Sequence, residues 1–234
     1  MNSILECRNL EKSYDGGRTK ALRGISLSLG KGRIIGLLGP NGSGKTTFIK
    51  LINGLLTPDG GELYIGGYPV GVETKRMISY LPEVTYLAKS MKVHQIISYF
   101  GDFYRDFDAG RAYEMLNRLN INPGDSLKTM SKGTKEKVQL IMVMSRNADL
   151  YVLDEPIGGV DPAARDYILD TIVSNYNPES TILLSTHLIA DVEQILDDVI
   201  FIREGSILLA EPAERLRKER GCSVDEAFRE VFRC

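Results

Sequence analysis

One glycine-rich segment, residues 34–47, restricts the possible folds of this chain most strongly. It reads Ile-Ile-Gly-Leu-Leu-Gly-Pro-Asn-Gly-Ser-Gly-Lys-Thr-Thr. The apolar run that ends at Leu38 predicts a buried strand, the part from Gly39 to Lys45 predicts a turn, and Thr46 onward predicts a helix. The spacing G-x-x-x-x-G-K-[ST] between a strand and a helix is typical of a loop that binds a nucleoside triphosphate.

Triphosphate binding follows from the chemistry of this loop. A dense negative charge needs inward-pointing backbone N–H groups and no Cβ atoms in the way, which Gly39, Gly42 and Gly44 permit; the helix N-terminus adds partial positive charge. We expect Lys45 to reach the β- and γ-phosphates and the Thr46 hydroxyl to hold Mg²⁺. An ordinary glycine-rich turn is disfavoured, because every fixed position of the motif is present. The other loop residues expected around the nucleotide are Pro40, Asn41, Ser43 and Thr47.

The composition is that of a globular protein. The chain has 234 residues, 43% hydrophobic and 26% charged, so a sizeable core is available. A net charge of −2 gives no general attraction to nucleic acid, and we expect no nucleic-acid partner. Three widely spaced cysteines (Cys7, Cys222 and Cys234) favour reduced thiols in a cytosol over a disulfide framework or a metal site.

No stretch of the sequence predicts a membrane span. The N-terminal residues lack the basic start and apolar run of a signal peptide. The longest apolar stretches, around 34–38 and 138–144, are far shorter than the roughly 20 residues that cross a bilayer. If this protein works at a membrane, we expect another chain to supply the spanning part.

Hydrophobic periodicity predicts a parallel α/β core with an antiparallel flank and a helical insertion. Short β-like runs over residues 3–29 predict the antiparallel sheet. The further strands are expected at 62–65, 77–81, 149–153, 181–185, 199–202 and 206–209. The helices are expected at 47–56, 93–104, 112–119, 131–144, 162–173 and 188–196, followed by two amphipathic segments, 212–220 and 224–233. We interpret residues 1–234 as one domain, with a helical subdomain at about 84–146 and a C-terminal tail at about 211–234.

A second element of a phosphate site follows the strand predicted at 149–153. This strand ends in Asp154 and Glu155, and the carboxyl ends of parallel strands face a ligand crevice. Asp154 suits the coordination of Mg²⁺, and Glu155 suits the base that aligns and deprotonates an attacking water. The alternative is that the two acids only cap the helix that starts after Pro162.

A further helix is predicted to begin within the segment Met130-Ser131-Lys132-Gly133-Thr134-Lys135. Ser131 is a good N-cap in any case. Because Gly133 allows close approach, this helix N-terminus is also a candidate anion site. One chain cannot easily aim two helix N-termini at one γ-phosphate, so we expect the second to act across a dimer.

In this order of motifs, the chain resembles an ATP-binding cassette (ABC) ATPase subunit over roughly residues 1–210. The resemblance implies the ABC ATPase fold, with the cofactors ATP and Mg²⁺. It implies that Tyr14 stacks on adenine and that Glu83 reaches the Mg²⁺ and the nucleophilic water. The other matched segments are the phosphate loop (39–46), the signature motif (131–134), the second phosphate motif (150–155), the D-loop (Gly159, Val160 and Asp161) and the switch histidine, His187.

Three of these positions have simpler structural interpretations when each is taken alone. Tyr14 on a β-turn is compatible with a half-buried surface aromatic residue. His187 would usually be a helix-start residue, although the context favours contact with the γ-phosphate. Asp161, before Pro162, is also a good helix N-cap, a role that is compatible with its place in a dimer interface.

The sequence departs from the family pattern at three positions. Glu83 replaces a glutamine, which adds negative charge near the metal and removes a hydrogen-bond donor when the side chain is ionised. Lys132 and Thr134 replace a glycine and the glutamine of the usual Leu-Ser-Gly-Gly-Gln signature. A subset of bacterial exporter-type ATPases is similar at both places, which favours export and leaves the hydrolysis rate open.

We therefore predict an ATP-hydrolysing subunit of an ABC transporter. It would act as a homodimer or heterodimer, at the cytoplasmic face of the cell membrane, on a separate transmembrane permease that exports an unknown substrate. The alternative is a soluble ABC ATPase with a mechanical or regulatory role, including a nucleotide-gated clamp without turnover. A small-molecule kinase is disfavoured, because no residues suggest an acceptor site.

Overall fold

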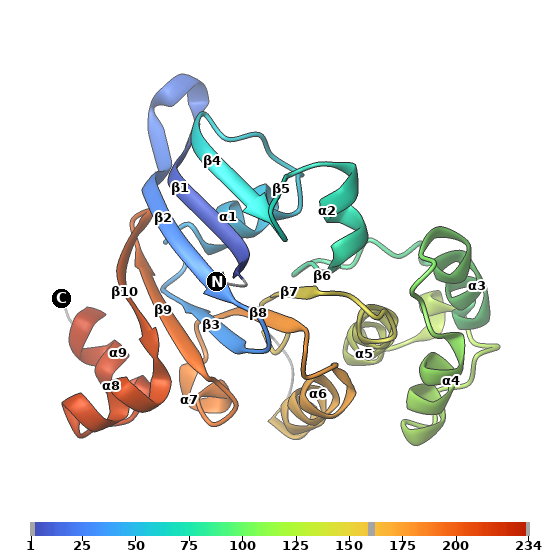
Figure 1. The fold of residues 1–234 in the computed structure, drawn as a ribbon. Helices are drawn as coiled ribbons and strands as arrows, with labels where there is room; N and C mark the ends of the chain where they lie inside the picture. The colour runs from blue at the N-terminus through green and yellow to red at the C-terminus, as the bar shows by residue number, and fades with distance from the viewer. Residues whose placement is uncertain (1–2, 159–161, 233–234) are drawn as a thin grey trace.

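The computed structural model describes residues 3–158 and 162–232. Two sheets form the centre of this part of the chain, and helices cover both (Figure 1). The expected class, an α/β core with an antiparallel flank and a helical subdomain, is confirmed.

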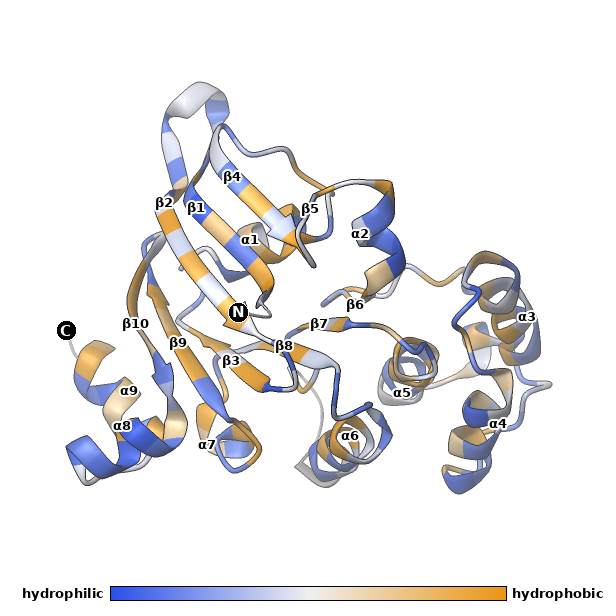
Figure 2. Cartoon of the chain, viewed as in Figure 1, coloured by the Kyte–Doolittle hydropathy of each residue, from blue (hydrophilic) through white to orange (hydrophobic). Residues whose placement is uncertain are grey.

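The smaller sheet is antiparallel, with the strand order β2-β1-β4-β5. Its first two strands form one long hairpin around a short 3₁₀ turn at 15–17, rather than the several short runs expected from the sequence. The strands β2 and β4 alternate between hydrophilic and hydrophobic residues (Figure 2), as expected for a sheet with one face on the core. The bounds are β1 Ser3–Tyr14, β2 Thr19–Gly30, β4 Gly60–Ile65 and β5 Tyr68–Pro69.

The larger sheet has the strand order β10-β9-β3-β8-β7-β6, and every neighbouring pair is parallel except β10 with β9. Every residue of β3, β7 and β8 is buried, which explains why these strands have continuous apolar runs instead of alternation. The bounds are β3 Ile34–Leu38, β6 Ile78–Leu81, β7 Leu150–Asp154, β8 Thr181–Thr186, β9 Asp198–Arg203 and β10 Ser206–Pro212.

The larger sheet separates two hydrophobic cores. Residues that point to one face, such as Leu37 and Val152, pack with α1 and the antiparallel sheet, so that α1 lies between the two sheets (Figure 1). Residues that point to the other face, such as Leu38 and Leu153, pack with the remaining helices. The helix bounds are α1 Lys45–Ile52, α2 Val72–Met77, α3 Val93–Phe103, α4 Ala109–Arg118, α5 Lys132–Met144, α6 Pro162–Asn175, α7 Ile189–Val192, α8 Ala213–Arg220 and α9 Val224–Phe232.

Three local predictions need correction. The helix expected over 188–196 is only the four residues of α7, because the chain must turn to enter β9: the Asp197 amide donates to the Ile34 carbonyl, and the Ile34 amide donates to the Asp197 carboxylate. The helix expected at 47–56 begins at Lys45 and ends at Ile52. The short elements β5 and α2 were not expected, because segments of two and six residues carry little periodicity.

One buried arginine joins the helical part of the chain to the larger sheet. The Arg146 guanidinium, just after α5, donates to both carboxylate oxygens of Asp106 at 3.0–3.2 Å. It also donates to the backbone carbonyls of Ile78 and Arg76 and lies 3.9 Å from the centre of the Tyr104 ring. Arg146 therefore fixes strand β6 and the segment after α3 to the end of α5.

We expect Arg146→Ala to lower the free energy of unfolding by about 3 kcal/mol, because it leaves Asp106 and two backbone carbonyls without their donor. Chemical denaturation monitored by circular dichroism measures the loss. The control is Arg8→Ala, since Arg8 pairs with Glu6 on the surface and its removal should leave stability unchanged. Equal stability of the two variants would contradict the joining role of Arg146.

Candidate functional site

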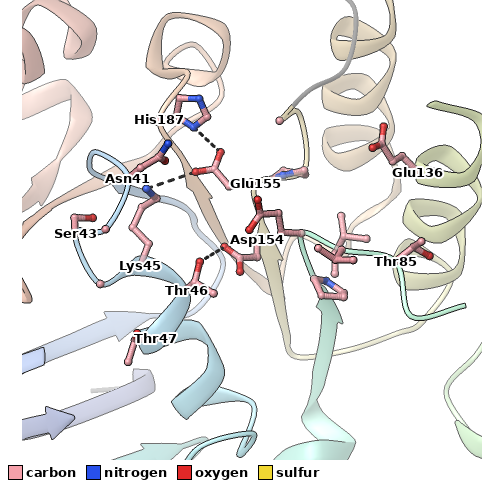
Figure 3. Close-up of a pocket in the computed structure, with 18 of the residues that line it drawn as sticks. Asn41, Ser43, Lys45, Thr46, Thr47, Thr85, Glu136, Asp154, Glu155 and His187 are labelled. Carbon is pink, nitrogen blue, oxygen red and sulfur yellow. Dashed lines mark hydrogen bonds and ion pairs between the residues drawn. The ribbon is translucent and has the colours of Figure 1, made fainter. Parts of the chain in front are cut away.

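The candidate site is a cavity of about 850 Å³ at the carboxyl ends of the central parallel strands. The phosphate loop after β3 and the acids at the end of β7 lie on one side (Figure 3). The start of α5 and the segment after β6 lie on the other. The predicted site residues that line it are Tyr14, Asn41, Gly42, Ser43, Gly44, Lys45, Thr46, Thr47, Glu83, Asp154, Glu155 and His187.

The loop needs glycine for reasons of packing as well as ligand access. A Cβ atom on Gly39 would lie 2.4 Å from the Ile202 carbonyl oxygen. Gly44 has a φ of +109°, and a Cβ atom there would lie 2.7 Å from the carbonyl oxygen of Ala21. Any larger side chain at either position would therefore displace the loop from the strands beneath it.

The ammonium group of Lys45 lies within the loop that precedes it. Its Nζ donates to the carbonyl oxygens of Gly39 at 2.7 Å and Pro40 at 3.2 Å, and it lies 3.5 Å from Glu155 Oε1. The side chain is buried, so this charge faces the cavity rather than bulk water. Gly39 and Pro40 themselves serve through their carbonyl groups and do not line the cavity.

Asp154 is a buried carboxylate that depends on two hydroxyl donors. Ser185 Oγ donates to Asp154 Oδ1 at 2.6 Å, and Thr46 Oγ1 donates to the same oxygen at 3.4 Å. Burial raises the pKa of Asp154, these two hydrogen bonds lower it, and the negative charges of Glu83 and Glu155 raise it further. The pKa of Asp154 is raised overall, because its surroundings do not compensate the ionised carboxylate for the loss of water.

The oxygen atoms near Asp154 suit Mg²⁺, which prefers hard oxygen ligands. The Thr46 hydroxyl, the Asp154 carboxylate and the Glu83 carboxylate line one cavity. Over residues 3–158 and 162–232, no cluster of three or more His, Cys, Asp or Glu side chains is placed to hold a metal. Mg²⁺ usually takes one or two protein carboxylates and completes its shell with waters and substrate phosphates, so the residues present fit this ion.

Glu155 is held between two nitrogen groups (Figure 3). One oxygen lies 3.5 Å from the Lys45 ammonium, and the other lies 3.0 Å from His187 Nδ1. The backbone of Glu155 is left-handed, with a φ of +50°, a conformation that costs of order 1 kcal/mol outside glycine. Its amide donates to both the carbonyl and the hydroxyl of Ser185, which hold this backbone in place. The carboxylate is thereby directed into the cavity, where it can accept a proton.

Tyr14 lies at the edge of the cavity, at the end of β1. Its hydroxyl is 3.3 Å from Thr47 Oγ1, which ties the ring to the phosphate loop. The residue is 37% exposed, so Tyr14 is accessible at the edge of the cavity.

The predicted signature residues Ser131 and Gly133 lie outside the cavity that the other predicted site residues line. Ser131 Oγ accepts a hydrogen bond from the amide of Thr134 at 3.1 Å and caps α5, as expected. Gly133 has no heavy atom within 4 Å of a Cβ position. Neither residue lines the chain's own cavity, although Lys132, Lys135 and Glu136 do. The D-loop residue Asp161 lies outside the described residues.

Sequence reasoning missed the residues that hold the acids in place. Ser185 is the main partner of Asp154, and Gln139 on α5 donates to the Pro82 carbonyl, next to Glu83. Ser185 lies in a strand that was expected, but its role follows only from the pairing of Asp154 with Ser185 across β7 and β8. No local pattern around either residue indicates that contact.

Comparisons with known proteins agree with the geometry. The profile described as "ABC transporter" matches residues 22–158. The chain belongs to the ABC transporter family. It is similar to the linearmycin resistance ATP-binding protein of Bacillus subtilis, with 32% identity over 213 residues that cover 88% of this chain and 68% of that protein. It is similar, too, to the Nod factor export ATP-binding protein I of Cupriavidus metallidurans, with 30% identity over 97% of this chain and 78% of that protein.

A solved structure of this family has the same fold. The structure described as the ATP-binding subunit of an ABC transporter superposes with a TM-score of 0.87 at 29% identity, over 98% of this chain and 99% of that one. The chain is thus an ATP-binding and ATP-hydrolysing subunit of an ABC transporter, as the sequence predicted. No helix within residues 3–158 and 162–232 is both long and apolar enough to cross a membrane.

When neither nucleotide nor Mg²⁺ is present, we expect the substitution Asp154→Asn to raise the melting temperature of the protein. Burial raises the pKa of Asp154, so at neutral pH the ionised side chain destabilises the folded state. The gain should shrink as the pH falls through the raised pKa, because the wild-type carboxyl group then becomes protonated in the folded state. Differential scanning fluorimetry between pH 4 and pH 8 measures both effects.

The matched control is Asp166→Asn, at an exposed position on α6, where no gain is expected. A lower melting temperature for Asp154→Asn at neutral pH would show that the charge of Asp154 stabilises the fold. That result would contradict a net cost of burying this carboxylate.

Proposed function

We propose that this subunit binds Mg²⁺-ATP at its phosphate loop and hydrolyses it with Glu155 as the base, to drive export through a separate permease. The observation that carries the proposal is the convergence of Lys45, Thr46, Asp154, Glu155 and His187 on one cavity. These are the groups that phosphoryl transfer to water needs: a phosphate-binding cation, metal ligands and a base.

Each group has a role that fits its position. Lys45, which now faces two loop carbonyls and Glu155, would turn to the β- and γ-phosphates. Thr46 and Asp154, with Glu83, would hold Mg²⁺, which neutralises charge on the phosphates. Glu155 accepts the proton of the attacking water, and His187 orients that carboxylate through the 3.0 Å contact and faces the γ-phosphate. Tyr14, at the accessible edge of the cavity, would stack on adenine. The loop from Gly39 to Thr47 would bind the phosphates, with Gly39 and Pro40 acting through their carbonyl oxygens on Lys45.

We propose that two ABC subunits must face each other for hydrolysis. Ser131 and Gly133 are at the exposed start of α5 but do not line the chain's own cavity, which supports a role at the nucleotide of an opposing subunit. From the family resemblance, we assign Asp161 to the same dimer interface. The partner is a second copy or another ABC subunit, and closure would be favoured because ATP makes contacts in the closed dimer that the open one lacks.

Aromatic residues on the helical part of the chain support docking to a membrane permease. Tyr99 and Phe103 on α3 are exposed, with their ring centres 4.5 Å apart. Val84 and Tyr86, in the segment after Glu83, are exposed as well. Solvent-exposed apolar side chains of this size suit a protein partner, and this segment would transmit the state of the nucleotide site to it. The subunit would then lie on the cytoplasmic face of the cell membrane.

Export is proposed from the names of the relatives. One is described as a linearmycin resistance protein and another as a Nod factor export protein. Both descriptions fit the expectation of an exporter-type subunit.

We expect Glu155→Gln to slow ATP hydrolysis by about 10²- to 10⁴-fold, because the amide cannot accept the proton of the attacking water. Phosphate release measures turnover, and a fluorescent ATP analogue should bind as tightly as to the wild type. The variant should also accumulate as an ATP-bound dimer. Unchanged turnover would remove Glu155 from the role of base.

We expect Ser131→Arg to block ATP-induced dimerisation, because a bulky cationic side chain fills the space that a second subunit would occupy at the start of α5. ATP binding by the single subunit should be unchanged, since Ser131 lies outside its own cavity. Size-exclusion chromatography with ATP in the Glu155→Gln background reports the dimer fraction. If the dimer fraction of this variant equals that of the Glu155→Gln parent, Ser131 does not act at the opposing subunit.

A further inference from the structure

The two C-terminal helices, α8 and α9, form a tail that packs on the larger sheet beside the short helix α7 (Figure 1). Leu216 of α8 and Val224 of α9 are fully buried in the core on that face of the sheet. The rings of Phe201 in β9 and Phe228 in α9 meet edge to face, with their centres 5.4 Å apart. Because this apolar packing anchors the tail, the loss of one polar contact between the tail and α7 would leave the tail folded.

Glu193, the residue directly after α7, joins this short helix to both helices of the tail. Its backbone carbonyl accepts a hydrogen bond from the Arg217 guanidinium of α8, and its Oε2 atom accepts one from the Asp225 amide of α9 at 3.1 Å. Its own amide donates to the Ile189 carbonyl, which closes the single turn of α7. Glu193 therefore ties the end of α7 to residues 24 and 32 positions further along the chain.

His187 lies just before the other end of α7, two residues ahead of Ile189. Its side chain is 42% exposed, and its Nδ1 atom lies 3.0 Å from Glu155 Oε2. Because so much of the ring is in solvent, packing does little to fix it, and its place beside Glu155 depends on the backbone that carries it. A helix of four residues is too short to hold that backbone by itself.

Two further contacts help to hold α7. Ile189 and Val192 are buried in the core, and the Asp191 carboxylate accepts a hydrogen bond from Arg165 of α6 at 2.7 Å. The tail therefore shares the task of fixing α7 with the core and with α6. We expect its polar contacts to adjust the position of His187 without deciding the fold.

We propose that the tail positions His187 against Glu155 by holding α7, with Glu193 as the residue that joins them. This inference rests on the proposed function, in which Glu155 is the base and His187 orients it. Arg217 and the Asp225 amide hold Glu193, and thereby the end of α7. The fixed backbone of α7 keeps the His187 ring at the carboxylate of Glu155. The tail thus sets how often the base is correctly oriented, which affects turnover and leaves ATP binding unchanged.

The chain has two histidines, His94 and His187, so NMR of the imidazole groups reads the position of His187 directly. In the untagged full chain, a His187→Ala variant assigns the two signals. His94 in α3 is the internal reference, since its Nδ1 atom lies 2.9 Å from the Pro123 carbonyl oxygen, away from α7. We expect Arg217→Ala to shift and broaden the His187 signal, because the ring loses its fixed place beside Glu155. The His94 signal should stay unchanged.

The matched control for Arg217→Ala is Arg215→Ala, which removes the same side chain from the same helix. Arg215 is 63% exposed and pairs with Glu211 and Glu219, not with Glu193. We expect this control to leave both histidine signals and turnover unchanged.

Phosphate release supplies a second measurement. We expect Arg217→Ala and Glu193→Ala each to lower kcat by about three- to tenfold, while the KM for ATP stays within about twofold. Glu193→Gln should keep the parental kcat, since its amide oxygen still accepts a hydrogen bond from the Asp225 amide. In a His187→Ala background, Arg217→Ala should cause no further loss, because its effect acts through that ring.

The outcomes separate this inference from the proposed function. If His187→Ala hydrolyses ATP as fast as the wild type, the proposed role of His187 at the base fails, and the NMR signal alone decides whether the tail positions its ring. An unchanged His187 signal in Arg217→Ala overturns the inference. So does an equal change of the His94 signal, which would report a general loosening of the fold. A loss of kcat by the same factor with and without His187 would also overturn it.

Discussion

The site depends on two hydrogen bonds to the buried carboxylate of Asp154, one from Ser185 and one from Thr46. They join three elements at one point: the end of β7, the end of β8 and the start of α1. Without these donors, an ionised group that is 1% exposed would be too costly to keep in the core. Even with them, burial keeps the pKa of Asp154 raised. A bound Mg²⁺ would supply positive charge beside this carboxylate.

Helix α5 connects that site to the rest of the helical part. Its first turn carries Ser131 and Lys132, and its middle holds the Pro82 carbonyl through Gln139. Just past its end, Arg146 donates hydrogen bonds to Ile78 in β6 and to Asp106. A movement of α5 would therefore also move Glu83, which follows Pro82, and the segment after α3. This arrangement supports the proposed link between the nucleotide site and the exposed residues Tyr99 and Phe103.

Two of the three departures from the family pattern, Glu83 and Lys132, line the same cavity. Glu83 adds a negative charge to the cavity wall, and Lys132 adds a positive one to another part of that wall. Lys132 Nζ lies 3.7 Å from Glu136 Oε1, and the second oxygen of Glu136 has no hydrogen-bond partner in the described ranges 3–158 and 162–232. In the sequence alone, these positions look like unrelated substitutions in separate motifs.

Local sequence patterns are enough to predict the short-range parts of this protein. The spacing of Gly39, Gly44, Lys45 and Thr46 predicted the loop, and the apolar run before Asp154 predicted a buried strand, because backbone freedom and side-chain periodicity act over a few residues. The tertiary structure decided which groups meet. Asp154 bonds to residues 31 and 108 positions away, and His187 lies against Glu155 across 32 positions. Strand order and register bring these residues into contact although they are far apart in the sequence, and no local pattern encodes that order and register.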